Sequence, residues 1–209
     1  LAGKYKDPVN LSDIYVYPVL KGERITNKKE KRIYKEKDEI IDFIKQKKYI
    51  VISGEKEYGK TALLKQLYKD FYSMKMYPVM VDATTLNTGD GDELNDRIAT
   101  SYTQQYLNLD KETILQMEPE RRVCIIDNYE EIKISDKVIK SIFCYLTSKF
   151  GTVIITSNIQ NELVNFLKNV ESKEYLDNKF TRLYIQDIKN YMRRKLIDKW
   201  LLLADDGQD

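Results

Sequence analysis

The sequence contains no histidine, only two cysteines and no long apolar run. The absence of histidine excludes catalysis by a histidine base or nucleophile and removes the commonest metal ligand. Any reaction must therefore depend on carboxylates, lysine, hydroxyl groups and a metal ion that binds with its substrate. No stretch approaches the roughly 20 apolar residues that span a bilayer, and the first residues lack the apolar core of a signal peptide. We therefore expect a cytoplasmic protein with no membrane partner.

Charge and length also limit the function classes. With 35 lysines and arginines against 33 acidic residues, the net charge of +2 creates no global field that would demand a nucleic acid. A chain of 209 residues fits one sizeable α/β domain with a short attachment. Cys124 and Cys144 both fall in predicted core elements, where they act as small buried hydrophobic residues, with a disulfide as the alternative.

The most informative segment is 54–61, which reads Gly-Glu-Lys-Glu-Tyr-Gly-Lys-Thr and matches the phosphate-loop pattern G-x-x-x-x-G-K-[ST]. A β-branched apolar run precedes it at 49–53, and apolar residues at helical spacing follow it at 63–71. Glycines let successive N–H groups point at one phosphate, and the start of a helix adds its positive dipole end. Lys60 would reach the β- and γ-phosphates, and the Thr61 hydroxyl would bind Mg²⁺. The alternative is a chance match in a turn.

The predicted nucleotide-binding residues are Gly54, Glu55, Lys56, Glu57, Tyr58, Gly59, Lys60, Thr61 and Ala62.

The rest of the chain alternates between strand and helix patterns. Further strands are predicted at 78–83, 123–127, 153–156 and 183–185, and helices at 40–44, 94–106, 111–117, 138–146, 162–167 and 188–201. Strands that are apolar throughout and alternate with helices predict a three-layer α/β fold with a five-stranded, mainly parallel sheet.

Three parts of the chain differ in pattern. Residues 1–35 are predicted to be an attachment segment with a short extended stretch at 13–18, and 36–187 form the nucleotide-binding core. Residues 188–209 begin a further part with an amphipathic helix. The charge-dense stretch 27–37 is interpreted as a solvated linker or helix face, with a nucleic-acid contact as the alternative.

An acidic residue ends the third predicted strand. Asp127 follows an apolar run, so in a parallel sheet it emerges at the carboxyl edge beside the phosphate loop and can hold Mg²⁺ with Thr61. Glu131, and after it Glu130, are candidates for the base that polarises the attacking water. The alternatives are a capping aspartate and a solvated acidic turn.

Ser157 and Asn158 end the fourth predicted strand at the same edge. They are candidates for sensing a γ-phosphate, and the alternative is that they cap the next helix. No arginine stands in an obvious position to neutralise transition-state charge, so such a residue would come from a neighbouring subunit or another domain. We expect a slow ATPase at best.

Three stretches, 54–61, 123–131 and 153–158, together resemble the nucleotide-binding core of STAND-class signalling ATPases, the AAA+-related group of P-loop NTPases that includes NACHT and NB-ARC domains. The chain is also similar to bacterial defence proteins that join such a core to an effector domain. The resemblance implies ATP and ADP as ligands, Mg²⁺ as cofactor, a helical lid that begins at 188–209, a winged helix beyond it and oligomerisation on nucleotide exchange. The chain departs from many relatives at Asn128, where they carry a second acidic residue.

Three functions remain open. The first is a nucleotide-dependent regulatory switch with slow Mg²⁺-dependent hydrolysis. The second is an AAA+-like ATPase that loads onto or remodels nucleic acid, for which the last helix offers a compact basic group: Lys189, Arg193, Arg194 and Lys195. The third is a scaffold that binds ADP without turnover.

Overall fold

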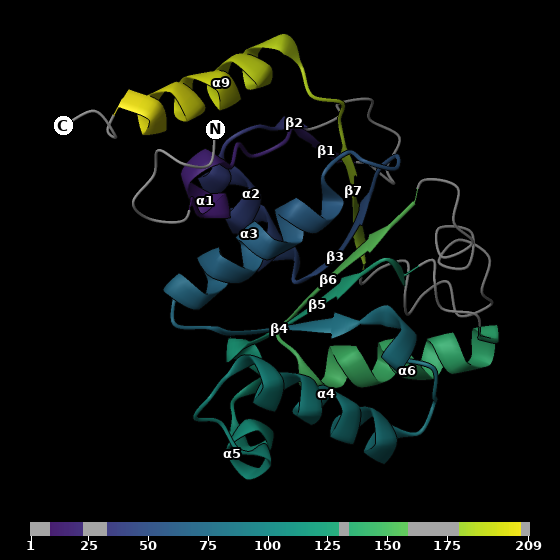
Figure 1. Ribbon diagram of the computed structural model, residues 1–209. Helices are drawn as coiled ribbons and strands as arrows, with labels where there is room; N and C mark the ends of the chain where they lie inside the picture. Colours follow the sequence, from purple (N-terminus) through teal and green to yellow (C-terminus); the bar gives the residue numbers. More distant parts are fainter. Residues whose placement is uncertain (1–8, 23–32, 130–133, 159–179, 206–209) are drawn as a thin grey trace.

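The structure is a computed structural model that describes residues 9–22, 33–129, 134–158 and 180–205 (Figure 1). In these residues the chain forms one seven-stranded sheet. The strands are β1 (Leu20–Gly22), β2 (Ile33–Tyr34), β3 (Tyr49–Ser53), β4 (Tyr77–Asp82), β5 (Arg122–Asp127), β6 (Thr152–Ser157) and β7 (Thr181–Ile185). Their order across the sheet is β2-β1-β7-β3-β6-β5-β4.

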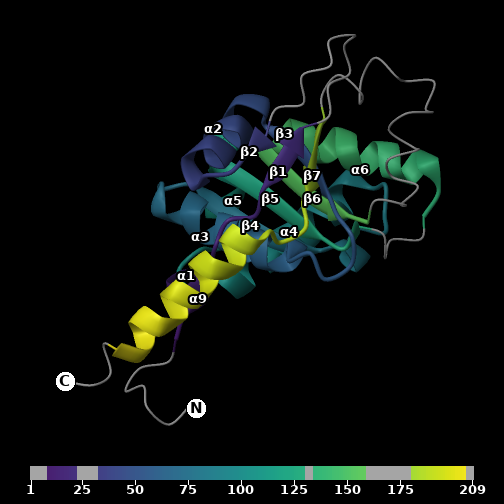
Figure 2. The same cartoon turned by 90° about the horizontal axis from the view of Figure 1, so that it is seen from above.

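The helices of the described residues cover both faces of this sheet (Figures 1 and 2). They are α1 (Leu11–Ile14), α2 (Lys37–Lys47), α3 (Lys60–Ser73), α4 (Gly91–Gln105), α5 (Lys111–Gln116), α6 (Asp136–Lys149) and α9 (Asn190–Asp205), with short 3₁₀ turns at Ala83–Thr85 and Pro119–Arg121. The predicted helix at 162–167 lies outside the described residues. None of the helices described is long and apolar enough to cross a bilayer.

The three-layer α/β prediction is confirmed. The five predicted strands, β7, β3, β6, β5 and β4, are all parallel. Along β3, Ile50 and Ile52 face the core cluster that includes Leu63 and Phe71 of α3, whereas Val51 faces the cluster that includes Phe143 of α6. Because both faces are buried, these strands are apolar throughout rather than alternating.

The sheet has two strands more than predicted, and both come from the segment 1–35. β1 pairs antiparallel with β7 on one side and with β2 on the other. The two strands have three and two residues, too few to show a pattern in the sequence. The described part of this segment therefore joins the sheet of the predicted core.

The predicted extended stretch at 13–18 is wrong for its first two residues. Leu11–Ile14 form a helical turn, and the Asp13 carboxylate accepts a hydrogen bond from the backbone N–H of Asn10 at 2.8 Å. This capping interaction satisfies backbone donors locally and outweighs the weak alternation of the sequence. The backbone is extended at Tyr15, directly after this turn.

Both cysteines are free thiols, with Cys124 buried and Cys144 partly buried. Burial raises the pKa of the Cys124 thiol well above its usual range. The interpretation of Cys124 as a small buried hydrophobic residue is confirmed, and the disulfide alternative is wrong.

Candidate phosphate-binding site

The segment 54–59 forms a tight loop between β3 and α3. Two of its residues adopt left-handed backbone conformations, Glu57 with φ of 68° and Gly59 with φ of 81°. The loop is joined to the neighbouring strand by the N–H of Gly54, which donates to the Ser157 carbonyl oxygen at 3.3 Å. α3 begins directly after Gly59, which has no side chain to cap the first N–H groups of the helix. These N–H groups and the helix dipole favour an anion at this position.

The two glycines of the loop are needed for different reasons. At Gly59 the requirement is conformational, because only glycine adopts a positive φ without cost. At Gly54 it is steric: a Cβ placed there would lie 2.0 Å from Cγ2 of Ile185, which is buried on β7. The loop therefore packs directly against the Ile185 side chain of β7.

Lys60, the first residue of α3, is almost fully buried, and its ammonium group lies inside the loop. Nζ donates three hydrogen bonds of 3.0 Å each, to the carbonyl oxygens of Gly54 and Glu55 and to Oδ1 of Asn158. All three N–H donors of the ammonium are therefore used. Asn158 follows β6, so Lys60 links the loop to the end of the neighbouring strand.

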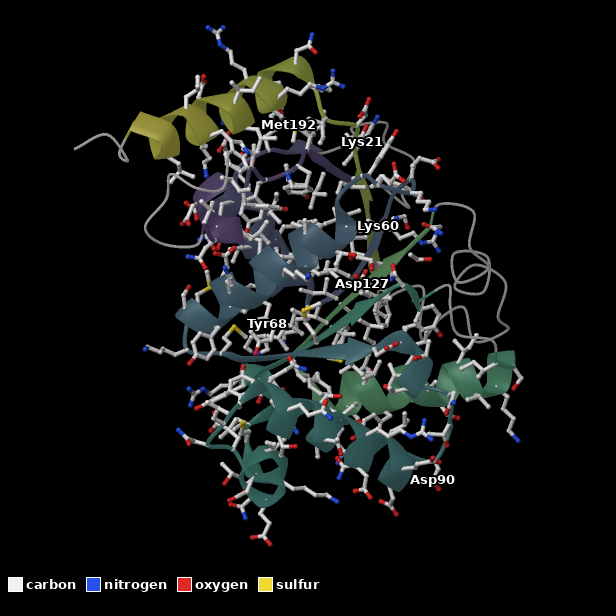
Figure 3. The ribbon with its side chains drawn as sticks, in the orientation of Figure 1. Lys21, Lys60, Tyr68, Asp90, Asp127 and Met192 are labelled. Carbon is white, nitrogen blue, oxygen red and sulfur yellow. The ribbon has the colours of Figure 1, made fainter. Side chains whose placement is uncertain are left out.

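Asp127 lies next to this group, at the carboxyl end of β5 (Figure 3). Its Oδ2 accepts a hydrogen bond of 2.5 Å from the Thr61 hydroxyl. Its Oδ1 accepts hydrogen bonds from the Thr156 hydroxyl and from the N–H of Asn128, which is left-handed with φ of 52°. Contacts from three segments thus fix the carboxylate beside the start of α3.

The donor set of Thr61 and Asp127 fits Mg²⁺. A hydroxyl and a carboxylate are hard oxygen ligands, and they already face each other at hydrogen-bond distance. In the part of the chain that the structure describes, no group of three or more histidine, cysteine or acidic side chains gathers at one place. A cation here would depend on oxygens from a bound phosphate, which is how Mg²⁺ usually binds with nucleotides.

The two predicted sensor residues differ in where their side chains lie. The amide of Asn158 reaches Lys60, whereas the buried hydroxyl of Ser157 donates to the carbonyl oxygen of Asn158, at 3.3 Å. Ile154 and Ile155 belong to opposite core clusters, so Thr156 shares the α3 face and Ser157 the other. The structure therefore does not bring the Ser157 side chain to Lys60 and Asp127.

Thr156 is a site residue that the sequence analysis did not single out from the polar residues at the end of this strand. Its hydroxyl reaches Asp127 because it points to the α3 face of the sheet. The period-2 alternation of 153–157 could have identified it, because residues two apart point to the same face.

The remaining predicted residues fall into three groups. The side chains of Glu55, Lys56 and Glu57 are exposed, so these residues contribute to the loop through their backbone. Tyr58 is partly buried and packs against the α3-side core, and Ala62 is also partly buried. Glu130 and Glu131 lie outside the described residues, so their assignment stays a prediction.

Arg97 and Arg121 each bind residues outside the phosphate loop. Arg97 donates to the carbonyl oxygen of Thr85 and to the side chains of Asn87 and Glu93. Arg121 donates to the carbonyl oxygen of Lys75 at 2.9 Å. The guanidinium group of Arg97, on α4, and that of Arg121, in the turn before β5, are therefore both engaged in these contacts.

Comparison with known proteins identifies the fold. No protein-family model matches the chain, and no curated protein matches it. A crystal structure of a DNA replication initiation factor is 12% identical with a TM-score of 0.50, and the match covers 80% of this chain and 49% of that one. Cdc6p from Pyrobaculum aerophilum is 11% identical with a TM-score of 0.43, over 80% and 46% of the two chains. A structure of Drosophila ORC bound to DNA is 10% identical with a TM-score of 0.40, over 75% and 92%.

The likeness to the first of these structures agrees with the layer order and the parallel sheet described above. The chain has the three-layer α/β fold of the first of these structures, and it spans about half the length of the first two.

Proposed function

We propose that this chain is an ATP- and ADP-binding P-loop module that acts as a nucleotide-dependent regulatory switch of the STAND type, with slow Mg²⁺-dependent hydrolysis of ATP. One observation carries the proposal. A nearly buried ammonium, Lys60, lies inside a glycine loop at the start of a helix, beside the hydrogen-bonded pair Thr61 and Asp127.

The contacts of Lys60 support an anionic ligand. Its ammonium donates to three neutral oxygens, two carbonyls and one amide. A phosphate oxygen is a better acceptor, because its negative charge adds Coulombic attraction to the hydrogen bond from the ammonium. A phosphate held by the loop N–H groups would take donors of Lys60 away from these oxygens. Lys60 would then bind the β- and γ-phosphates.

The contact between Lys60 and Asn158 supports a switch. Asn158 is held by Lys60 at the end of β6, so a ligand that takes over Lys60 frees the amide to contact a terminal phosphate. Thr61 and Asp127 would hold Mg²⁺, which would supply charge neutralisation at the phosphates. Glu131, or Glu130, would orient the attacking water. Because Arg97 and Arg121 are bound elsewhere, neither neutralises transition-state charge, and we therefore expect hydrolysis to be slow.

The domain division belongs to the same proposal. Residues 1–35 attach an effector domain, 36–187 form the nucleotide-binding core and 188–209 begin the helical lid. Further partners are a winged-helix or sensor domain and a second copy of the chain on activation.

A second candidate function is an AAA+ ATPase that loads onto nucleic acid. The observation that favours it is the basic group at the start of α9, where the side chains of Lys189, Arg193, Arg194 and Lys195 are all exposed. The structure with the TM-score of 0.50 is a DNA replication initiation factor. This candidate predicts DNA affinity that falls steeply with salt, because phosphate contacts release counterions. Binding that is absent at low salt would refute it.

Titration calorimetry with Mg·ADP and Mg·ATP tests the proposal. The parent chain should bind both, and Lys60→Ala should weaken binding by about 100-fold, since a charge-assisted hydrogen bond contributes roughly 1.5–3 kcal/mol. Lys65→Ala removes an exposed lysine from the same helix and is the matched control, with affinity unchanged. Equal affinity of Lys60→Ala and the parent would refute the assignment.

A single-turnover assay with Mg·ATP separates the switch from a scaffold that binds ADP without turnover. Slow phosphate release supports the switch. Strong thermal stabilisation by ADP without phosphate release would favour the scaffold.

A further inference from the structure

A short N-terminal segment lies between α9 and α3. We call residues 15–22 the strap. Figure 1 shows α9 on one side of the N-terminal elements and α3 on the other, and Figure 2 shows α9 beside α1. Besides its pairing with β2, the strap contacts the phosphate-loop helix α3, the strand β7 and the helix α9.

Asp70 anchors the strap to α3. Asp70 is 4% exposed, and its carboxylate accepts a hydrogen bond from the Tyr17 hydroxyl. It also binds Nζ of Lys37 at 2.6 Å and Nε2 of Gln66 at 3.3 Å. Burial and the contact with Asp70 raise the pKa of Tyr17 far above its usual range, so its hydroxyl stays a donor. Removing one of these partners would leave the buried charge of Asp70 less well compensated. Asp70 therefore holds its partners, Tyr17 among them, in place.

The far end of the strap reaches the phosphate loop through one side chain. The carbonyl oxygen of Val19 accepts a hydrogen bond of 2.9 Å from the N–H of Gln186. Leu20 then lies opposite Ile185 in the antiparallel pairing of β1 and β7. Ile185 packs against Gly54, the first residue of the loop, so closely that a Cβ on Gly54 would overlap it. A displacement of Gly54 therefore acts on the pairing of the strap with β7.

The near end of the strap contacts α9. Nζ of Lys199 donates to the carbonyl oxygen of Tyr15 at 2.7 Å, and the rings of Tyr15 and Tyr17 pack edge to face with centroids 5.2 Å apart. The next residue along α9 is Trp200, the only tryptophan of the chain, and its side chain is 45% exposed. Its emission therefore reports on the position of α9 beside the strap.

We propose that the strap couples the position of α9 to nucleotide occupancy of the phosphate loop, and that Asp70 is the positioning residue that holds the strap in register. This inference rests on the proposed nucleotide binding. The chain of contacts runs from Gly54 through Ile185 and Leu20 to Tyr17 and Tyr15, and from there to Lys199. Because such coupling is reciprocal, loosening the strap weakens nucleotide binding, and nucleotide binding shifts α9.

Titration of the full chain with Mg·ADP, followed by Trp200 emission and by calorimetry, tests the coupling. Tyr17→Phe removes only the hydroxyl that reaches Asp70, and Lys199→Met removes only the ammonium that reaches Tyr15. Each variant should lose at least half of the ADP-induced change in Trp200 emission. ADP affinity should fall about 5-fold, the lower end of typical coupling.

Two control variants separate coupling from a structural effect. Tyr102→Phe removes another buried hydroxyl contact, to the carbonyl oxygen of Tyr77, and Lys65→Met removes an exposed ammonium from α3. Both should keep the full emission change, even where Tyr102→Phe lowers the thermal midpoint.

The outcomes are distinguishable. ADP binding by the parent without any change in Trp200 emission would overturn the coupling and leave nucleotide binding intact. If Tyr17→Phe and Lys199→Met show the same ADP-induced change in Trp200 emission as the parent, the coupling is likewise overturned and nucleotide binding is left intact. A parent that binds no ADP would overturn the proposed function and the coupling with it.

Discussion

Substitution of Gly54 by alanine tests how the phosphate loop is packed. The added Cβ would lie 2.0 Å from Cγ2 and 3.4 Å from Cβ of Ile185. Ile185 is 2% exposed on β7, and its Cγ2 branches directly from Cβ, so this methyl group cannot swing away without moving the strand. Gly54→Ala should therefore overpack the site and lower the free energy of unfolding by about 1–3 kcal/mol.

A double-mutant cycle with Ile185→Ala isolates this contact. Ile185→Ala alone leaves a cavity and should cost about 2–4 kcal/mol. In that background the methyl group added by Gly54→Ala fills space that the Ile185 side chain occupied, so the cost of Gly54→Ala should shrink by about 1–2 kcal/mol. Urea unfolding of the four proteins measures each step.

Gly59→Ala is the control for the cycle. Among the described residues, a Cβ at Gly59 meets no atom within 4 Å, so the expected cost of about 1–2 kcal/mol arises from the positive φ of 81°. Ile185→Ala should not relieve it. If the effects of Gly54→Ala and Ile185→Ala are additive within about 0.5 kcal/mol, the packing argument is refuted.

Three further changes probe the site and the core. Asp127→Ala should abolish most of the Mg²⁺ dependence of ADP affinity, because the carboxylate paired with Thr61 is lost; calorimetry with Mg²⁺ or EDTA measures this, and unchanged metal dependence would contradict it. Asn158→Ala removes one of the three acceptors of Lys60 and should lower the ratio of ATP to ADP affinity by several-fold; an unaltered ratio would exclude phosphate sensing. Burial raises the pKa of Tyr145 to about 12. Because folding favours the protonated phenol, Tyr145 contributes fully to the free energy of unfolding below pH 10, and this contribution is lost as the pH rises towards 12. Urea midpoints of the parent should fall more steeply in this range than those of Tyr145→Phe, and parallel curves would argue against it.

The elements that carry the site could be predicted from the sequence because their patterns are local. β3 is a continuous apolar run, α3 has helical spacing after a glycine loop, and Asp127 ends a buried strand. Parallel pairing then brings the ends of β3, β5 and β6 to one edge without further information. The approach of Thr61 to Asp127 follows from this edge alone.

The contacts that the sequence did not reveal depend on distant parts of the chain. Asp70 lies in the pattern of an amphipathic helix, and its partner Tyr17 is 53 residues away. The antiparallel addition of β1 to β7 brings this segment beside α3. The packing of Ile185 on Gly54 likewise depends on how neighbouring strands pair. The sequence therefore predicted the glycine loop but not the β7 side chain that packs against it.

The most direct test of the account is a crystal structure of the chain with Mg·ADP. We expect the β-phosphate within hydrogen-bond distance of the backbone N–H groups of Gly59, Lys60 and Thr61, with Mg²⁺ bound by the Thr61 hydroxyl. Lys60 Nζ should contact the β-phosphate and no longer Asn158. A nucleotide bound elsewhere on the sheet, with the three contacts of Lys60 intact, would contradict the central claim.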